Sequence, residues 1–308
     1  MKRLDEFRLY YNHSIHPELR RMERHRVRLI RFLFVSVLLL IGVIALEVYI
    51  NIPAITFFMM VPIVLYLLYL SYRIQRFRST FKPNVINLIL DFIDDGPNYG
   101  TLYYDAKRSI PKSQFRASRI FESSADQYKG EDHISGRIGE LKFELCELDV
   151  KEFSRVRNRL NYVFKGVFMH ATITREVRGS VIILPKEFKQ YLSRSIKAAT
   201  LRGAHQVHSE ILDAPFEEVF MTYASPNANL AGLLSSPMQN ALAEYRQRTG
   251  KEIYLSFLKN EIYIAVTEHK DILEPYIFQS NVSFDLVREF FEDINLLIGI
   301  VEDIDHNY

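Results

Sequence analysis

The sequence of 308 residues contains a single cysteine, Cys146, and carries a formal net charge of only +2. One thiol excludes an intrachain disulfide and is compatible with a reducing cytoplasm. Cys146 falls in a predicted strand of residues 140–148, where we expect a small buried side chain rather than a reactive thiol. The small net charge excludes the strong basic field of a nucleic-acid-binding domain, so nucleic acid is not an expected partner.

The sequence also lacks the motifs of the common enzyme classes. It contains no glycine-rich phosphate loop, no nucleophile elbow and no internal repeat. Glycine and proline are scarce, at 12 and 11 residues, so the composition is that of an ordinary folded chain rather than of a low-complexity one. No reaction and no cofactor follow from these features, and a non-enzymatic role is the first expectation.

Two long apolar runs are present, at residues 32–50 and 55–72. Each is about 18 residues long, which is near the minimum that crosses the hydrocarbon core of a bilayer. The short linker of residues 51–54 predicts an antiparallel helical hairpin. A cleaved signal peptide is the main alternative for the first run, but some thirty residues precede it and no small-x-small cleavage site follows. A buried hairpin of a soluble protein is the other alternative.

Arginines flank both apolar runs on the same side of the predicted hairpin, and the linker between the runs has neither lysine nor arginine. The positive-inside rule therefore predicts that both chain termini are cytoplasmic. We expect the flanking arginines to contact the anionic headgroups of the bilayer. The residues chosen for this membrane-interface role are Arg24, Arg28, Arg31, Arg73 and Arg76.

Three regions follow from this pattern: cytoplasmic amphipathic and basic helices over residues 1–31, a transmembrane helical hairpin over 32–72, and a cytoplasmic domain over 73–308. In the first region, apolar residues recur at helical spacing, and Pro17 suits the first turn of a new helix. The recurring residues are Leu4, Phe7, Tyr10, Tyr11 and Ile15.

The third region mixes helices with antiparallel strands, which predicts the α+β class. Residues 252–258 and 261–266 form a predicted hairpin around the two-residue turn Lys259-Asn260. Arg178-Gly179 predicts a turn that joins two neighbouring strands of a meander. Helices are predicted at residues 85–92 and 113–121, at 236–249 with Ser236 as the N-cap, and at 284–304.

Two segments are candidate sites. His205 and His208 could bind a metal ion if their segment is helical, because a spacing of three brings both imidazoles to one face, with Glu210 nearby. If the segment begins a strand, the two side chains point to opposite faces. The second candidate is the loop of residues 225–229, a position where loops often hold ligands. Its candidate ligand-binding residues are Ser225, Asn227 and Asn229.

Three blocks of residues resemble one family. They are 128–139 with Phe143-Glu144; 164–168 with Arg178-Gly179 and Leu184-Pro185; and Thr249-Gly250-Lys251 with Ser256-Phe257, Tyr263-Ile264-Ala265 and Glu274-Pro275. In this order, after two apolar runs, the chain is similar to the bacterial membrane-protein family catalogued as domain of unknown function three-one-three-seven. The resemblance implies a bacterial inner-membrane location and a partner similar to the LemA family of membrane proteins. It implies no catalytic residue.

We therefore expect a membrane-anchored cytoplasmic binding or scaffolding module that forms homo-oligomers. A metal-assisted hydrolase that uses His205 and His208 is one alternative. A ligand or lipid sensor, with the loop of residues 225–229 at its pocket, is the other. No resident cofactor is expected for the binding module.

Overall fold

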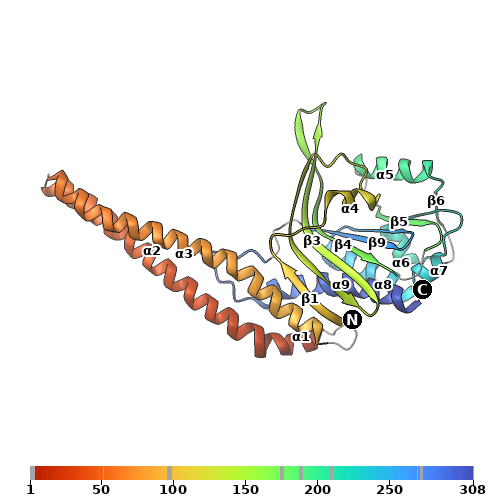
Figure 1. Ribbon diagram of the computed structural model, residues 1–308, viewed down its shortest axis with the longest axis horizontal. Helices are drawn as coiled ribbons and strands as arrows, with labels where there is room; N and C mark the ends of the chain where they lie inside the picture. Colours follow the sequence, from red (N-terminus) through yellow and green to blue (C-terminus); the bar gives the residue numbers. More distant parts are fainter. Residues whose placement is uncertain are drawn as a thin grey trace. The chain divides into compact units, whose positions relative to one another are not determined.

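The computed structural model describes residues 4–50, 52–95, 99–173, 177–186, 190–208, 211–268, 270 and 273–307 (Figure 1). The chain divides into two compact units. Lys2–Phe92 and Ile272–Phe291 form one, called here the helical unit. Ile93–Asp271 and Glu292–Tyr308 form the other, called here the sheet unit.

The helical unit consists mainly of two long helices. A short helix α1 (Leu4–Tyr10) and a turn of π-helix (Tyr11–Ile15) lead into α2 (His16–Ile50), and α3 (Pro53–Asp94) follows. Proline suits the first turn of a helix, and α2 and α3 both begin with a proline in that turn, as predicted for Pro17. Because α3 starts at Pro53, the connection between the helices is shorter than the predicted linker.

Both long helices meet the length and hydropathy criteria for a membrane span. Their apolar side chains are mostly exposed, with Tyr49 and Phe58 among the most exposed. Contiguous apolar surface of this extent needs a non-aqueous environment. The two helices therefore fit a membrane anchor, and the protein associates with a membrane.

An aromatic cluster lies at the other end of the helical unit. The Phe7 ring stacks on Phe291 with centroids 3.9 Å apart and lies 5.3 Å from Phe92, and the Tyr11 ring lies 5.0 Å from Phe284. Of the predicted apolar stripe, Phe7, Tyr11 and Ile15 are buried, whereas Leu4 is exposed. Arg26, also buried, donates a 2.5 Å hydrogen bond to the carbonyl of Ile277 and holds the segment before the last helix against α2.

The sheet unit contains a nine-stranded antiparallel sheet with strand order β1-β2-β3-β4-β9-β8-β5-β7-β6. The α+β class is confirmed. The strands are β1 Tyr99–Asp105, β2 Gln127–Ile138, β3 Leu141–Ser154, β4 Arg159–Thr172, β5 Ser180–Pro185, β6 His205–Gln206, β7 Phe220–Ala224, β8 Ile253–Leu258 and β9 Glu261–Thr267. The remaining helices are α4 Lys112–Ala117, α5 Gln190–Leu201, α6 Ala214–Val219, α7 Leu230–Leu233, α8 Ser236–Thr249 and α9 Phe284–Asn307, whose first turns belong to the helical unit.

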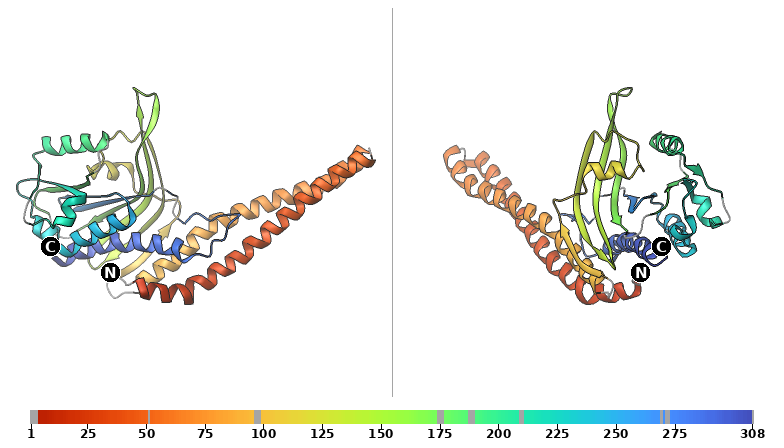
Figure 2. Two further views of the ribbon diagram at one scale, coloured as in Figure 1. Left: turned by 180° about the vertical axis from the view of Figure 1, so that it is seen from behind. Right: turned by 45° about the vertical axis from the view of Figure 1, so that its right-hand side comes forward.

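Helices cover both faces of the central strands (Figure 2). On one face, residues of α4 and α5 pack with Cys146, Phe168 and Tyr254 in a single buried cluster. Cys146 is buried, as predicted, and burial raises the pKa of its thiol to about 12. On the other face α8 lies beside the later turns of α9, where the Tyr245 hydroxyl donates a hydrogen bond to Asp293.

Three details differ from the sequence predictions. The predicted meander around Arg178-Gly179 is wrong, because the β8–β9 hairpin lies between β4 and β5. Nearly every residue of β8 and β9 is buried, so this hairpin must occupy the centre of the sheet rather than an edge. The N-cap of α8 is Ser235, whose Oγ accepts a hydrogen bond from the N–H of Met238, rather than Ser236. Helix α4 ends at Ala117, before the predicted boundary.

Candidate functional site

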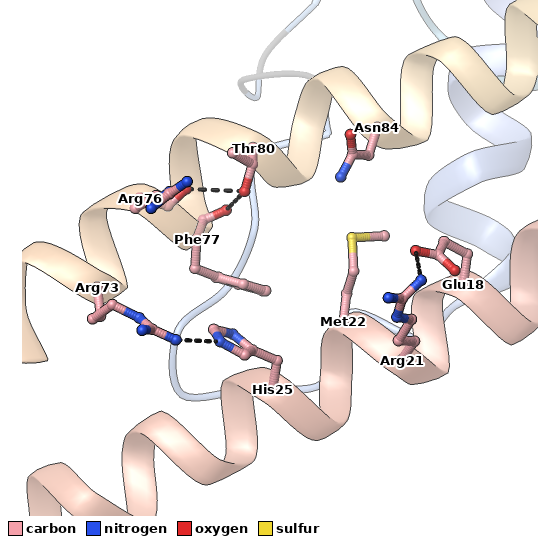
Figure 3. Close-up of a pocket in the computed structure, with 9 residues that line it drawn as sticks. All are labelled: Glu18, Arg21, Met22, His25, Arg73, Arg76, Phe77, Thr80 and Asn84. Carbon is pink, nitrogen blue, oxygen red and sulfur yellow. Dashed lines mark hydrogen bonds and ion pairs between the residues drawn. The ribbon is translucent and has the colours of Figure 1, made fainter.

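A pocket lies between α2 and α3 in the helical unit (Figure 3). Its cavity volume is about 360 Å³. The lining residues are Glu18, Arg21, Met22 and His25 of α2 and Arg73, Arg76, Phe77, Thr80 and Asn84 of α3. Because three of these residues are arginines and one is a glutamate, we call it the basic pocket.

Arg73 is held in place by two neutral partners. Its guanidinium donates to His25 Nε2 at 3.1 Å and to the Tyr69 hydroxyl at 3.0 Å. Burial lowers the pKa of His25, and the charges of Arg73 and Arg28 lower it further, so His25 is neutral and can accept this hydrogen bond. The imidazole also stacks on Phe77. These contacts orient Arg73, and neither partner neutralises its positive charge.

The rest of the lining adds charge and polar atoms. Arg76 lines the pocket and is exposed, and among the described residues no carboxylate lies within ion-pair distance of Arg73 or Arg76. Arg21 and Glu18 are 3.6 Å apart in a largely exposed pair, which contributes little stability. Opposite them, the Thr80 hydroxyl donates to the carbonyl of Arg76 at 3.0 Å. Three arginines against one glutamate leave two positive charges in excess.

The depth of the basic pocket follows from helix geometry. Arg76 is four residues past Tyr72, which ends the second apolar run, so it lies about 6 Å from the hydrocarbon edge. The headgroup layer is about 5–8 Å thick on each side of the hydrocarbon. Arg73 and Arg76 therefore lie at the level of lipid phosphates if the apolar runs span the bilayer. Guanidinium groups are suited to bind phosphate through paired N–H donors.

A second site is an open groove in the sheet unit, formed by β1 to β4, with a volume of about 670 Å³. We call it the sheet groove. At its centre Glu144 accepts from His133 at 3.0 Å and contacts His170 at 3.2 Å. His170 also contacts Glu261 of β9. The groove is lined by Tyr103, Arg108, His133, Ser135, Gly136, Arg137, Lys142, Phe143, Glu144, His170 and Thr172.

The charges in the sheet groove are coupled. Hydrogen bonds from His133 and His170 hold the pKa of Glu144 at about 2. Burial acts to lower the pKa of His170, but the neighbouring Glu144 and Glu261 outweigh burial and raise it. The groove thus presents an ionised carboxylate between two imidazoles, with arginine and lysine side chains around it. This arrangement suits an anionic or hydroxyl-rich ligand.

Within the described ranges, one group of at least three His, Cys, Asp or Glu residues has donor atoms within 4.8 Å of one another: Glu131, Asp132 and Glu147 on β2 and β3. Glu131 is exposed, and Asp132 already accepts a hydrogen bond from the Tyr104 hydroxyl. Acidic clusters of this kind are common without a bound ion, and nothing further distinguishes this one.

The predicted metal ligands lie at the sheet edge. His205 is exposed on β6, and His208 is exposed just beyond this strand, with its Nδ1 3.9 Å from a Glu217 carboxylate oxygen. Glu210 lies outside the described residues. The segment is a strand rather than a helix, so the helical arrangement of the two imidazoles is not formed. Metal binding by His205 and His208 stays a prediction that elemental analysis of the purified protein can test.

The predicted ligand loop is tied into the fold. Ser225 Oγ accepts a hydrogen bond from the N–H of Ser180 at 2.8 Å, and Gly179, at φ +80°, packs against it so closely that a Cβ would lie 2.2 Å from Ser225 Oγ. Asn229 caps α7 by accepting from the N–H of Gly232. Asn227 is exposed. The hydrogen bonds of Ser225 and Asn229 support the loop itself, and a ligand there stays a prediction.

Of the predicted membrane-interface residues, Arg73 and Arg76 line the basic pocket. Arg24, Arg28 and Arg31 lie exposed on α2 outside its lining. Sequence reasoning missed His25, although its spacing of four from Arg21 places both on one helical face. It also missed the sheet groove, because the pairing of Glu144 with His170 across β3 and β4 depends on strand register.

Residues 162–306 match the sequence profile of a family described as "Protein of unknown function (DUF3137)". This part of the chain is similar to that family. The match confirms the resemblance for its second and third blocks, whereas the first block, at residues 128–139, lies outside the matched residues. The DUF3137 segment runs from β4 into α9, so it supplies His170, Thr172 and Glu261 to the sheet groove and none of the residues of the basic pocket.

Among solved structures, the chain is similar to the crystal structure of the mycobacterial trehalose monomycolate transport factor A, TtfA. The TM-score is 0.32 at 8% identity, over 66% of this chain and 88% of that chain. A similarity of this size transfers neither fold nor function. No curated protein sequence matches the chain significantly.

Proposed function

We propose that the protein is a membrane-anchored binding module that holds the phosphate-bearing headgroup of an anionic lipid in the basic pocket. The observation that supports this function best is the position of Arg73 and Arg76. Both face a cavity at the depth of lipid phosphates, and neither is paired with a carboxylate among the residues described. Arg73 is half-buried and Arg76 is exposed, so the lack of a counter-ion is costly chiefly for Arg73, and an anion from the bilayer is its natural partner.

The geometry suggests how the headgroup is held. Arg73, oriented by His25 and Tyr69, donates paired N–H groups to a phosphate oxygen pair, and Arg76 adds a second positive charge to the lining. Met22 and Phe77 lie on the side of the arginines away from the hydrocarbon, where their apolar side chains pack against the outer part of the headgroup. Polar groups further from the bilayer are left for the rest of the headgroup.

The flanking arginines give the proposed orientation. Both chain termini face the cytoplasm of a bacterium, and the anchor lies in the inner membrane. The lipid then comes from the cytoplasmic leaflet, where anionic lipids give a negative surface potential. Fusion of a cysteine-reactive reporter site to either end, followed by labelling of intact cells with a membrane-impermeant reagent, tests this orientation. Labelling from outside would contradict it.

The lipid test compares two matched charge-removing variants of the full chain in detergent. Arg73→Gln/Arg76→Gln removes two arginines that line the pocket, and Arg24→Gln/Arg28→Gln removes two predicted interface arginines outside it. Native mass spectrometry measures retention of phosphatidylglycerol against phosphatidylcholine. We expect the pocket variant to lose at least about 10-fold in phosphatidylglycerol affinity, which corresponds to about 1.4 kcal/mol. Equal losses in both variants would indicate diffuse charge attraction and contradict a pocket.

We also propose that the anchored module self-associates, and that a LemA-like membrane protein is among its partners. The exposed apolar faces of α2 and α3 and the two edge strands of the sheet support association. Light scattering of the detergent-solubilised chain measures the oligomer mass. A strictly monomeric particle would contradict self-association and would not bear on the lipid site.

A second binding function is favoured by the sheet groove. Arg108, Arg137 and Lys142 line the groove around the paired Glu144 and His170, and this basic lining favours an anionic ligand. Inorganic phosphate or citrate should raise the melting temperature of the parent chain by a few degrees and have no such effect on Arg137→Gln/Lys142→Gln. Equal shifts in both would point to a salt effect.

A further inference from the structure

The β3–β4 hairpin extends past the neighbouring strands (Figures 1 and 2). Pairing of β3 with β2 ends at Lys151, and pairing of β4 with β9 begins at Gly166. Between these points the two strands pair only with each other, around a turn at residues 155–158. We call residues 151–162 the hairpin tip.

The hairpin tip exposes large apolar side chains. Val156 is 96% exposed, Tyr162 63%, Leu160 45% and Phe153 44%. Phe153 and Leu160 are cross-strand partners, so they form one apolar patch beneath the turn. Apolar surface gathered at the end of a protruding hairpin marks a place of interaction rather than of folding.

Arginines alternate with these apolar residues. Arg155, Arg157 and Arg159 lie at the turn, and no described carboxylate lies within ion-pair distance of any of them. The one acidic residue of the tip, Glu152, is already neutralised by Arg194, which donates two hydrogen bonds of 2.9 and 2.5 Å. Asp126 interacts electrostatically with Arg155, so Arg157 and Arg159 supply most of the positive charge that the tip presents among apolar side chains.

The tip is also preformed. Asp126 accepts a hydrogen bond from the N–H of Phe153 at 2.8 Å, and Ser154 Oγ accepts one from the N–H of Arg157. Lys151 lies over the Tyr162 ring, 4.4 Å from its centroid. These contacts hold the apolar and basic side chains in place before any partner binds, which lowers the entropy lost on docking.

We infer that the hairpin tip docks on the anionic phospholipid surface of the bilayer that anchors the chain. Val156 and Leu160 enter the interface, while the arginines extend to lipid phosphates. An acidic protein would match the charge equally well, but the bilayer is tethered to this chain and is present at high effective concentration. This inference needs the α2–α3 anchor and does not depend on the basic pocket.

Within the sheet unit, the tip lies at the end of β3 opposite the β2–β3 turn, and the 14 residues of this strand span about 46 Å.

The test uses a tryptophan reporter, because the chain has no tryptophan of its own. The full-length Val156→Trp variant is placed in nanodiscs of phosphatidylcholine and phosphatidylglycerol in a ratio of 70 to 30, with or without brominated acyl chains. We expect a blue-shifted emission and at least about twofold quenching by the brominated lipids. The matched control, Ile211→Trp, carries its reporter on an exposed residue before α6 and should not be quenched.

Charge variants separate this inference from the lipid pocket. In the Val156→Trp background, Arg155→Gln/Arg157→Gln/Arg159→Gln should abolish the quenching, and Arg73→Gln/Arg76→Gln should leave it unchanged. Emission at the wavelength of free tryptophan, without quenching, would overturn the docking. A blue shift that brominated lipid does not quench would place the tip against protein, a second copy included, and would overturn the lipid as occupant.

Discussion

The buried charge cluster around Lys251 allows a quantitative prediction of how protein stability changes with pH. Lys251 Nζ lies 2.5 Å from a Glu268 oxygen and 2.8 Å from Asp293 Oδ2, and all three side chains are buried. Burial acts to lower the pKa of Lys251, but Asp293 and Glu268 outweigh it and raise it, so the amine stays charged. Burial raises the pKa of Asp293 to about 6 even with the lysine present.

Replacing Lys251 by methionine leaves two buried carboxylates without their counter-ion. Removing one partner of a buried ion pair costs about 3–5 kcal/mol. At neutral pH the variant must either keep a buried charge or take up a proton on folding, which raises the folded-state pKa of Asp293 above that of the parent. The folded variant then binds more protons than its unfolded chain, so its stability falls as pH rises.

The pH window follows from these shifts. Above about pH 6 the parent has lost its proton from Asp293, while the variant still holds one. The stability difference should therefore grow by about 1.4 kcal/mol per pH unit, or about 2 kcal/mol between pH 6 and pH 7.5. Urea unfolding of the full chain in detergent, followed by circular dichroism, measures it at both pH values.

A matched control is Lys197→Met, which removes an exposed lysine from α5 and should change stability by less than about 0.5 kcal/mol at both pH values. A loss below about 1 kcal/mol for Lys251→Met, or a loss that does not vary with pH, would refute the reasoning. Either result would mean that water reaches Asp293 and Glu268 in the folded protein.

Three further outcomes are expected. Glu144 has a pKa near 2, so its ionised form stabilises the fold fully above its ordinary pKa, and this stability is lost as pH falls from about 4.5 toward 2. In Glu144→Gln, the free energy of unfolding should therefore lack this pH-dependent loss of up to about 3 kcal/mol, measured by acid unfolding. Ser235→Ala should cost about 1 kcal/mol in thermal unfolding because it removes the N-cap of α8, whereas Ser236→Ala should cost less; equal losses would count against the cap. Phe7→Ala should destabilise the helical unit by about 3–5 kcal/mol in urea, against less than about 0.5 kcal/mol for the exposed Leu9→Ala, and similar values for both would contradict the aromatic cluster.

Local patterns predicted the elements well. The two apolar runs became α2 and α3, because about 18 consecutive apolar residues leave few structural options. The β8–β9 hairpin formed around Lys259-Asn260, since two apolar runs on either side of a two-residue turn pair with their nearest neighbour. Cys146 proved buried, as a small side chain in an alternating strand should be.

Pairings between distant residues were not predictable in the same way. The position of β8 and β9 between β4 and β5 depends on which strands can be buried on both faces, and that is decided only when the whole sheet assembles.

The sequence by itself thus determined the membrane anchor, the α+β class and the basic flank, because each depends on the type and spacing of residues close together in the chain. The tertiary structure decided the sites. Lys251 meets Asp293 across 42 positions of the chain, and Glu144 meets His170 across 26. His25 faces Arg73 across 48 positions because α2 and α3 pack side by side. Contacts of this kind depend on strand register and helix packing, which no local spacing encodes.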